Sequence, residues 1–160
     1  YDMKLSSLAP TAALLSALMV APAFANPDIY VVNFRHAEDA NSQQLNAQLP
    51  KVLRMAEVNA EEVVIDTSTA AKWTKAAHDA FNRDIVPVFN KWVGLPGFAA
   101  VVDADSKSII GCLTPRADAD TLARELRNMA ARSKGEAVMT AASSSAATAC
   151  PDTFNIPPVQ

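Results

Sequence analysis

The side chains best suited to chemistry in this 160-residue chain are those of its two cysteines, Cys112 and Cys150. They are about 38 residues apart, far from the C-x-x-C spacing of a catalytic dithiol. The chain also carries an export signal, described below, and an even number of cysteines in an exported chain favours a disulfide. In the chain-entropy model, closing a loop of this length would stabilise the fold by roughly 3–4 kcal/mol. Two unpaired cysteines, or a bond from Cys150 to a partner protein, are the alternatives.

A short polar cluster, His36, Glu38 and Asp39, is the nearest approach to a metal site. A metal site needs three or four ligands with defined geometry, and the second histidine, His78, belongs to a different predicted element. We therefore interpret the cluster as the polar start of a helix, with Asp39 as its N-cap and Glu38 favoured by the helix dipole.

Other catalytic patterns are weak. Ser42 and Ser68 have no G-x-S-x-G context, and the paired carboxylates Glu61 and Glu62 precede a predicted strand, where solvent is expected to cover them. The formal net charge is −3, and no basic run of the kind used for nucleic-acid binding is present. We therefore predict no catalytic residue, no metal or other cofactor and no nucleic-acid partner.

The export signal occupies residues 1–25, two of which precede the first methionine. Lys4 supplies the positive charge, and Leu5–Val20 is an apolar stretch of about 16 residues, shorter than the ~20 that a membrane-spanning helix needs. Ala21–Ala25 has the small-residue pattern of a cleavage site. We expect a periplasmic or secreted protein that begins near Asn26 and has no integral membrane segment after cleavage.

The elements that must position these residues follow the order β-α-β-α-β-β-α. Strands are predicted at residues 29–34, 63–65, 98–102 and 108–112. Helices are predicted at residues 41–58, at 73–93 and from 118 onward. Crossovers between the early strands imply parallel pairing and the closing hairpin adds antiparallel strands, which gives an α/β fold with a four-stranded mixed sheet and helices on both faces.

Two prolines modify the predicted helices. Pro50 kinks the first helix or starts its second half, and Pro87 either bends the second helix or divides it into two pieces that meet near Val86. An aromatic stripe at helical spacing in the second helix is assigned to the core. Its members are Trp73, Phe81, Phe89 and Trp92.

The C-terminal part, residues 133–160, is predicted to be a low-complexity linker followed by an extended tail. Residues 140–149 are Ala, Ser and Thr alone, with little to bury. A disulfide from Cys112 to Cys150 would bring this tail back over the edge of the sheet and cover a strand that could otherwise pair with another chain.

The element order, and Leu95-Pro96 directly before the strand Phe98–Val102, resemble the thioredoxin-like fold over about residues 28–132. The predicted domain covers residues 26–132. The resemblance implies a cis-proline at Pro96, because members of this fold place one at the head of the third strand. Members with redox activity carry C-x-x-C after the first strand, where this chain has no cysteine. The resemblance therefore implies a redox-inactive member.

Thioredoxin-like proteins use the groove beside the cis-proline to hold extended peptides, a form of strand addition. The resemblance thus implies binding of another envelope protein or an extended peptide. The implied groove residues are Phe34, Arg35, His36, Trp92, Leu95 and Pro96. Residues 92–96 with the apolar strand ending in Asp103 are also similar to accessory proteins of conjugative type IV secretion systems.

Two alternatives remain open from the sequence. The first is a thiol-dependent oxidoreductase or peroxidase relative that uses Cys112 or Cys150 alone. The second is a structural envelope protein without a specific groove. A low-pKa, reactive thiol would distinguish the enzyme from the binding protein.

Overall fold

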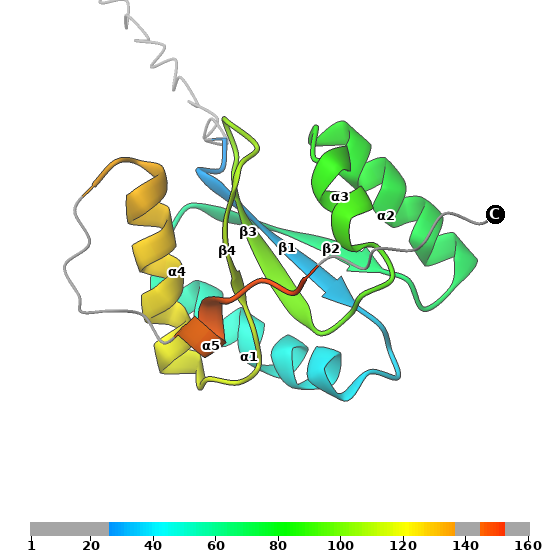
Figure 1. Ribbon diagram of the computed structural model, residues 1–160, viewed down its shortest axis with the longest axis horizontal. Helices are drawn as coiled ribbons and strands as arrows, with labels where there is room; N and C mark the ends of the chain where they lie inside the picture. The colour runs from blue at the N-terminus through cyan, green and yellow to red at the C-terminus, as the bar shows by residue number, and fades with distance from the viewer. Residues whose placement is uncertain (1–25, 137–144, 153–160) are drawn as a thin grey trace, which may run out of the picture.

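The computed structural model describes residues 26–136 and 145–152 of the chain (Figure 1). The predicted signal peptide, residues 1–25, lies outside the described residues, as do residues 137–144 of the linker and 153–160 of the tail. No helix in the described part is long and apolar enough to cross a membrane.

A four-stranded mixed sheet forms the centre of the fold, as predicted, with the strands in the order β2-β1-β3-β4. The strands are β1 (Ile29–Arg35), β2 (Ala60–Asp66), β3 (Phe98–Asp103) and β4 (Ile109–Leu113). β1 pairs in parallel with β2 and antiparallel with β3, and β3 pairs antiparallel with β4. The parallel crossover and the closing hairpin are both confirmed, and the architecture is consistent with a thioredoxin-like α/β fold.

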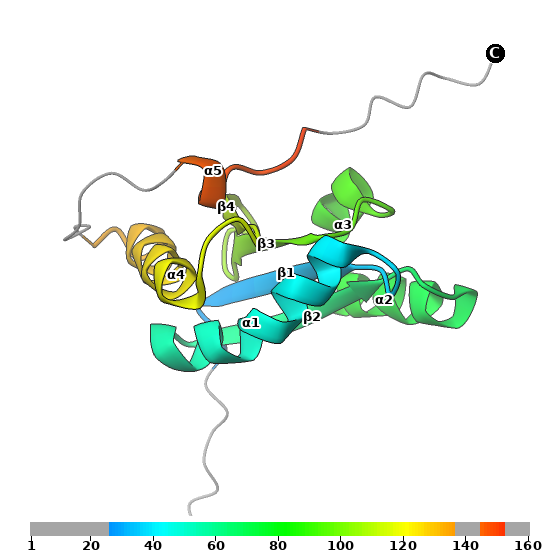
Figure 2. The ribbon, with the colours of Figure 1, turned by 90° about the horizontal axis from the view of Figure 1, so that it is seen from below.

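Helices cover both faces of this sheet (Figure 2). Their bounds are α1 (Ala40–Ala56), α2 (Ala70–Asn82), α3 (Val86–Trp92) and α4 (Ala119–Ser133). Successive residues of a strand point to opposite faces. Val31 of β1 therefore packs with α1 and α4 in one core cluster, whereas Val32 packs with α2 and α3 in the other.

The helix starts follow the capping residues in the sequence. Asp39 Oδ2 accepts a hydrogen bond from the Ser42 N–H at 2.7 Å, and Asp118 Oδ1 accepts one from the Thr121 N–H at 2.8 Å. Both are N-cap bonds that satisfy a free helix donor. Pro50 is exposed and lies inside α1, which continues through it to Ala56.

The long helical pattern in the middle of the chain divides near Val86, as predicted. α2 ends at Asn82 and α3 begins at Val86, with Pro87 in its first turn, where a missing N–H costs nothing. The core assignment of the aromatic stripe is confirmed for Phe89 and Trp92 in α3. It is wrong for Trp73 and Phe81 of α2, which are 46% and 73% exposed.

The C-terminal segment differs from the expected linker. Residues Ser145–Thr148 form a short helix, α5, which packs against β4. Ala147 is fully buried in the cluster of α1 and α4. The expectation that this segment has little to bury is therefore wrong at Ala147, and the segment belongs to the fold.

Candidate functional site

A cleft of about 450 Å³ opens where β1 ends, β3 begins and β4 ends. Segments far apart in the sequence form its walls: the first turn of α1, the loop before β3, the residues after β4 and the C-terminal segment. The lining residues are Asn41, Leu95, Pro96, Gly97, Phe98, Thr114, Pro115, Arg116, Ala149, Cys150, Pro151 and Asp152. Its volume is within the usual range for ligand sites, roughly 300–1,000 Å³.

The loop before β3 is held close to the start of α1 by Gly97. Its φ of +96° is a backbone conformation that favours glycine. A Cβ at this position would lie 2.7 Å from Cβ of Asn41 and 2.8 Å from Oδ2 of Asp39, so the loop can approach the helix only because the side chain is absent. The Gly97 N–H donates to the Phe34 carbonyl at 2.8 Å, which fixes the loop to the end of β1.

Leu95 and Pro96, two of the groove residues that the resemblance implied, line the cleft. The peptide bond between them is trans, as are all the peptide bonds of the described residues. The cis-proline that the resemblance implied is therefore not present. The Leu95 N–H donates to the Trp92 carbonyl at 2.9 Å, so the turn that follows α3 presents these two residues to the cleft.

Two of the other predicted groove residues, Phe34 and Trp92, are buried beneath the cleft and pack against its lining. Phe34 and Trp92 are 1% and 2% exposed and do not line it. Phe34 stacks on Phe98 with ring centroids 5.0 Å apart, and Trp92 meets Phe98 edge-on at 5.4 Å. Because Phe98 does line the cleft, this aromatic cluster gives the cleft a rigid floor.

Arg35, the third of these residues, lies outside the cleft and is paired with Asp66. Its Nε is 3.3 Å from Asp66 Oδ2, and Lys72 Nζ is 3.4 Å from the same oxygen. Burial acts to raise the pKa of Asp66, but hydrogen bonds from Ser68 and the charge of Lys72 outweigh it and lower the pKa to about 2. Arg35 therefore belongs to an ion-pair network beside the N-terminus of α2.

His36, the last of the predicted groove residues, also lies outside the cleft. Its N–H donates to Oγ of Ser42 at 3.1 Å, and its Nδ1 accepts from the Glu38 N–H at 3.3 Å. With Asp39 as the N-cap, the cluster is the polar helix start that the sequence predicts. Among the described residues, no three His, Cys, Asp or Glu side chains come together in a group that could hold a metal ion.

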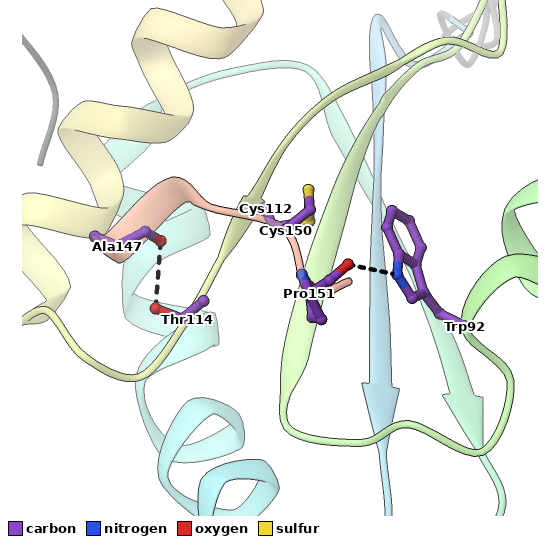
Figure 3. Close-up of a disulfide and its surroundings, with 6 residues drawn as sticks. All are labelled: Trp92, Cys112, Thr114, Ala147, Cys150 and Pro151. Carbon is purple, nitrogen blue, oxygen red and sulfur yellow. Dashed lines mark hydrogen bonds between the residues drawn. A yellow bond between two sulfur atoms is a disulfide. The ribbon is translucent and has the colours of Figure 1, made fainter. Parts of the chain in front are cut away.

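The C-terminal segment, residues 145–152, is called the strap here, and its residues 149–152 form one wall of the cleft. A disulfide joins Cys112 of β4 to Cys150 of the strap, with Cα atoms 5.0 Å apart (Figure 3). The Trp92 indole Nε1–H donates to the Pro151 carbonyl at 3.2 Å. The predicted disulfide is therefore formed, and it holds the strap against the edge of the sheet.

The strap passes around this edge from one face to the other. Its first part inserts Ala147 into the cluster of α1 and α4, and Cys150 packs against the cluster of α2 and α3. At the first of these anchors the Thr114 N–H, just beyond β4, donates to the Ala147 carbonyl at 3.1 Å. The Thr114 Oγ1–H donates to the same carbonyl at 3.4 Å (Figure 3). β4 is an edge strand, and an unpaired edge invites pairing with another chain.

The polar groups of the cleft suit binding better than covalent chemistry. Its described lining contains no histidine, and its one cysteine is in the disulfide. Arg116 and Asp152 are exposed and place opposite charges on the lining. Reasoning from the sequence missed Arg116 and Asn41, because the first comes from the residues after β4 and the second from the first turn of α1. One sequence signal for Arg116 was available, the chain break at Thr114-Pro115. These residues follow β4 at the same end of the sheet where Leu95 precedes β3.

A second surface feature lies on α2, on the outside of the fold. Trp73, Thr74, Ala77, His78 and Phe81 form a shallow, mostly apolar surface. The edge of Trp73 packs on Phe89, with ring centroids 5.8 Å apart, which leaves the rest of its indole open to solvent. Nothing in the described structure covers this surface.

Comparisons with known proteins leave the family open. No protein-family model matches the chain, and no curated protein and no solved structure matches it significantly. The cleft and its strap are thus the features from which a function has to be argued.

Proposed function

We propose that this chain is an exported, redox-inactive thioredoxin-like protein that binds an extended segment of another envelope protein in the cleft. The observation that carries the proposal is the cleft itself, which has Leu95-Pro96 on its wall and no dithiol. Both cysteines of the chain are in one disulfide, so a thiol-dependent enzyme would lack its nucleophile in this state. An insulin-reduction assay is expected to show no turnover.

The main chain beside Pro96 favours a ligand that donates hydrogen bonds. The N–H groups of Leu95 and Gly97 already donate to the carbonyls of Trp92 and Phe34, and proline has no N–H. This loop therefore offers carbonyl oxygens to a ligand. An extended peptide backbone supplies N–H donors at regular spacing, and strand addition uses that pairing.

The charges on the lining add a side-chain preference. Arg116 presents a guanidinium, which binds a carboxylate with two parallel hydrogen bonds. Asp152 offers a carboxylate on the strap side. An extended segment that carries an acidic residue near Arg116 and a basic residue near Asp152 fits this arrangement best.

Peptide selection tests the proposal. Residues 26–160, once with the disulfide intact and once reduced, are used to select binders from a random library of extended peptides, and amide chemical shifts then locate the bound peptide. The largest changes are expected at Gly97, Thr114 and Arg116. Arg116→Glu should weaken binding by about fivefold, the worth of one exposed charge pair, whereas Arg124→Glu on the exposed side of α4 should not. Failure to enrich any peptide, or shifts confined to α2, would contradict the proposal.

A more specific role follows from the similarity of residues 92–96 to accessory proteins of conjugative type IV secretion. We propose that the partner is a component of such a secretion system in the cell envelope. Deleting the gene in a donor strain should lower conjugative transfer, and the wild-type gene should restore it. Restoration by an Arg116→Glu variant to the wild-type level would separate this role from the cleft.

A further inference from the structure

The strap has the contacts of a bound ligand, although it is part of the same chain. It offers the Ala147 carbonyl to the Thr114 N–H and the Pro151 carbonyl to the Trp92 indole, and it places one methyl group in the core. Ala147 lies in the short helix α5, but both hydrogen-bonded groups of the strap are main-chain carbonyls, the kind of group that a bound peptide also presents. Residues 149–152 also form one wall of the cleft.

The non-covalent contacts of the strap include neutral hydrogen bonds and packing. The Ala147 carbonyl accepts from the N–H and Oγ1–H of Thr114, the Pro151 carbonyl accepts from the Trp92 indole, and the Ala147 methyl group is buried. Each neutral hydrogen bond contributes only a small net stability. Fixing the backbone of residues 145–152 costs conformational entropy at every position. The disulfide is therefore the interaction that keeps the strap in place.

The two sulfur atoms differ in access. Cys112 is fully buried, whereas Cys150 is partly exposed. An incoming thiolate needs a path to the sulfur that it attacks. Of the two residues, Cys150 is therefore the more accessible to an attacking thiolate.

We propose that the Cys112–Cys150 disulfide is a redox latch on the cleft, and that reduction by a protein dithiol frees the strap so that a partner's extended segment takes its place. This inference rests on the proposed function. A thiolate of the reductant attacks Sγ of Cys150, the bond between the two sulfurs breaks, and Cys112 leaves as a thiolate that takes up a proton. The second thiol of the reductant attacks the mixed disulfide and releases Cys150, so two electrons and two protons pass from the dithiol to the latch.

Release of the strap can be measured without any ligand. In residues 26–160 carrying Trp73→Phe, Trp92 is the one remaining tryptophan of the two in the sequence. Reduction by a thioredoxin-type dithiol protein should shift the Trp92 emission to the red and speed hydrogen exchange at the Thr114 amide at least tenfold, with far-ultraviolet circular dichroism unchanged. A monothiol form of the reductant should be trapped on Cys150 and not on Cys112.

Binding is then measured with a peptide from the selection described above, in the oxidised and the reduced protein. The affinity for the peptide is expected to rise about tenfold or more on reduction. A Cys112→Ser/Cys150→Ser variant should have the affinity of the reduced protein, and adding the reductant should not change it. The latch would be overturned by equal peptide affinity in both states, by an unchanged hydrogen-exchange rate at the Thr114 amide, or by global unfolding on reduction. Strap release without peptide binding in either state would support the release and refute the proposed binding function.

Discussion

Gly97→Ala is the substitution by which the geometry of the cleft can be tested most sharply. The backbone at Gly97 has φ +96°, and a Cβ there would lie 2.7 Å from Cβ of Asn41 and 2.8 Å from Oδ2 of Asp39. Both atoms belong to the start of α1, and that same Asp39 oxygen accepts the N-cap hydrogen bond from Ser42. The added methyl group therefore has to displace the capping carboxylate, the loop or both.

Two contributions set the size of the effect. A non-glycine residue at positive φ costs roughly 1–2 kcal/mol, and loss of an N-cap hydrogen bond costs about 1 kcal/mol. Gly97→Ala is therefore expected to lower the free energy of unfolding by about 2–3 kcal/mol. Gly94 is the matched control, because it has φ +90° and no atom within 4 Å of its added Cβ. Gly94→Ala should cost the backbone contribution alone.

Urea unfolding of residues 26–160 with the disulfide intact measures both variants. The difference between them should be about 1 kcal/mol or more, and it should shrink when Asp39→Ala is combined with Gly97→Ala, because the cap is then already lost. Equal losses for Gly97→Ala and Gly94→Ala would refute the close approach of the loop to α1. An additive double variant would show that the methyl group does not act through the cap.

Three further predictions concern the rest of the fold. The pKa of Asp66 is lowered from 3.8 to about 2, so its carboxylate stabilises the fold by at most about 2 kcal/mol, present above pH ~4 and lost as the pH falls to about 2. The difference in unfolding free energy between wild type and Asp66→Asn should therefore disappear over that pH range. A difference that does not depend on pH would contradict this. Phe81 is 73% exposed, so Phe81→Gln should change the free energy of unfolding by less than about 0.5 kcal/mol, and a loss of several times that in urea unfolding would show that Phe81 is packed. Glu125 is 1% exposed and its Oε2 has no hydrogen-bond partner in the described structure, so Glu125→Met should stabilise the fold by about 1 kcal/mol, and destabilisation would reveal a partner for the carboxylate.

The sequence was sufficient for features that depend on local chemistry. Asp39 and Asp118 cap helices because their side chains accept hydrogen bonds from N–H groups three residues away. The break at Val86 follows from the position of Pro87. The disulfide followed from the even cysteine count and the export signal. Each of these inferences needs little knowledge of the distant parts of the chain.

The failures arise from tertiary packing. α2 packs on the sheet through two small residues, Ala76 and Ala80, so the larger Trp73 and Phe81 stay outside. A hydrophobic pattern alone assigns large apolar residues to the core, and it cannot tell which stripe of an apolar helix faces the sheet. The isomer of the Leu95–Pro96 bond is likewise not fixed by the dipeptide, because trans is the ordinary state of an X–Pro bond.

The candidate site shows the same division. A sequence motif pointed to Leu95 and Pro96, and both line the cleft. Phe34 and Trp92 were expected there as well, but they are buried and support it. Arg116 was not predicted, since its contribution depends on the register of β4 beside β3. Three loops meet in the cleft, and their meeting is a property of the strand order.

The two edges of the sheet are protected in different ways, and the difference bears on how a partner binds. β2 carries Glu61, which is ion-paired with Arg83, and Glu62, which accepts a hydrogen bond from Asn33. Charged side chains on an edge strand discourage pairing at all times. β4 is instead covered by the strap, and the disulfide that holds the strap can be broken by a dithiol. A partner that adds a strand to this sheet should therefore pair with β4, beside the cleft, and should bind more tightly once the strap has left.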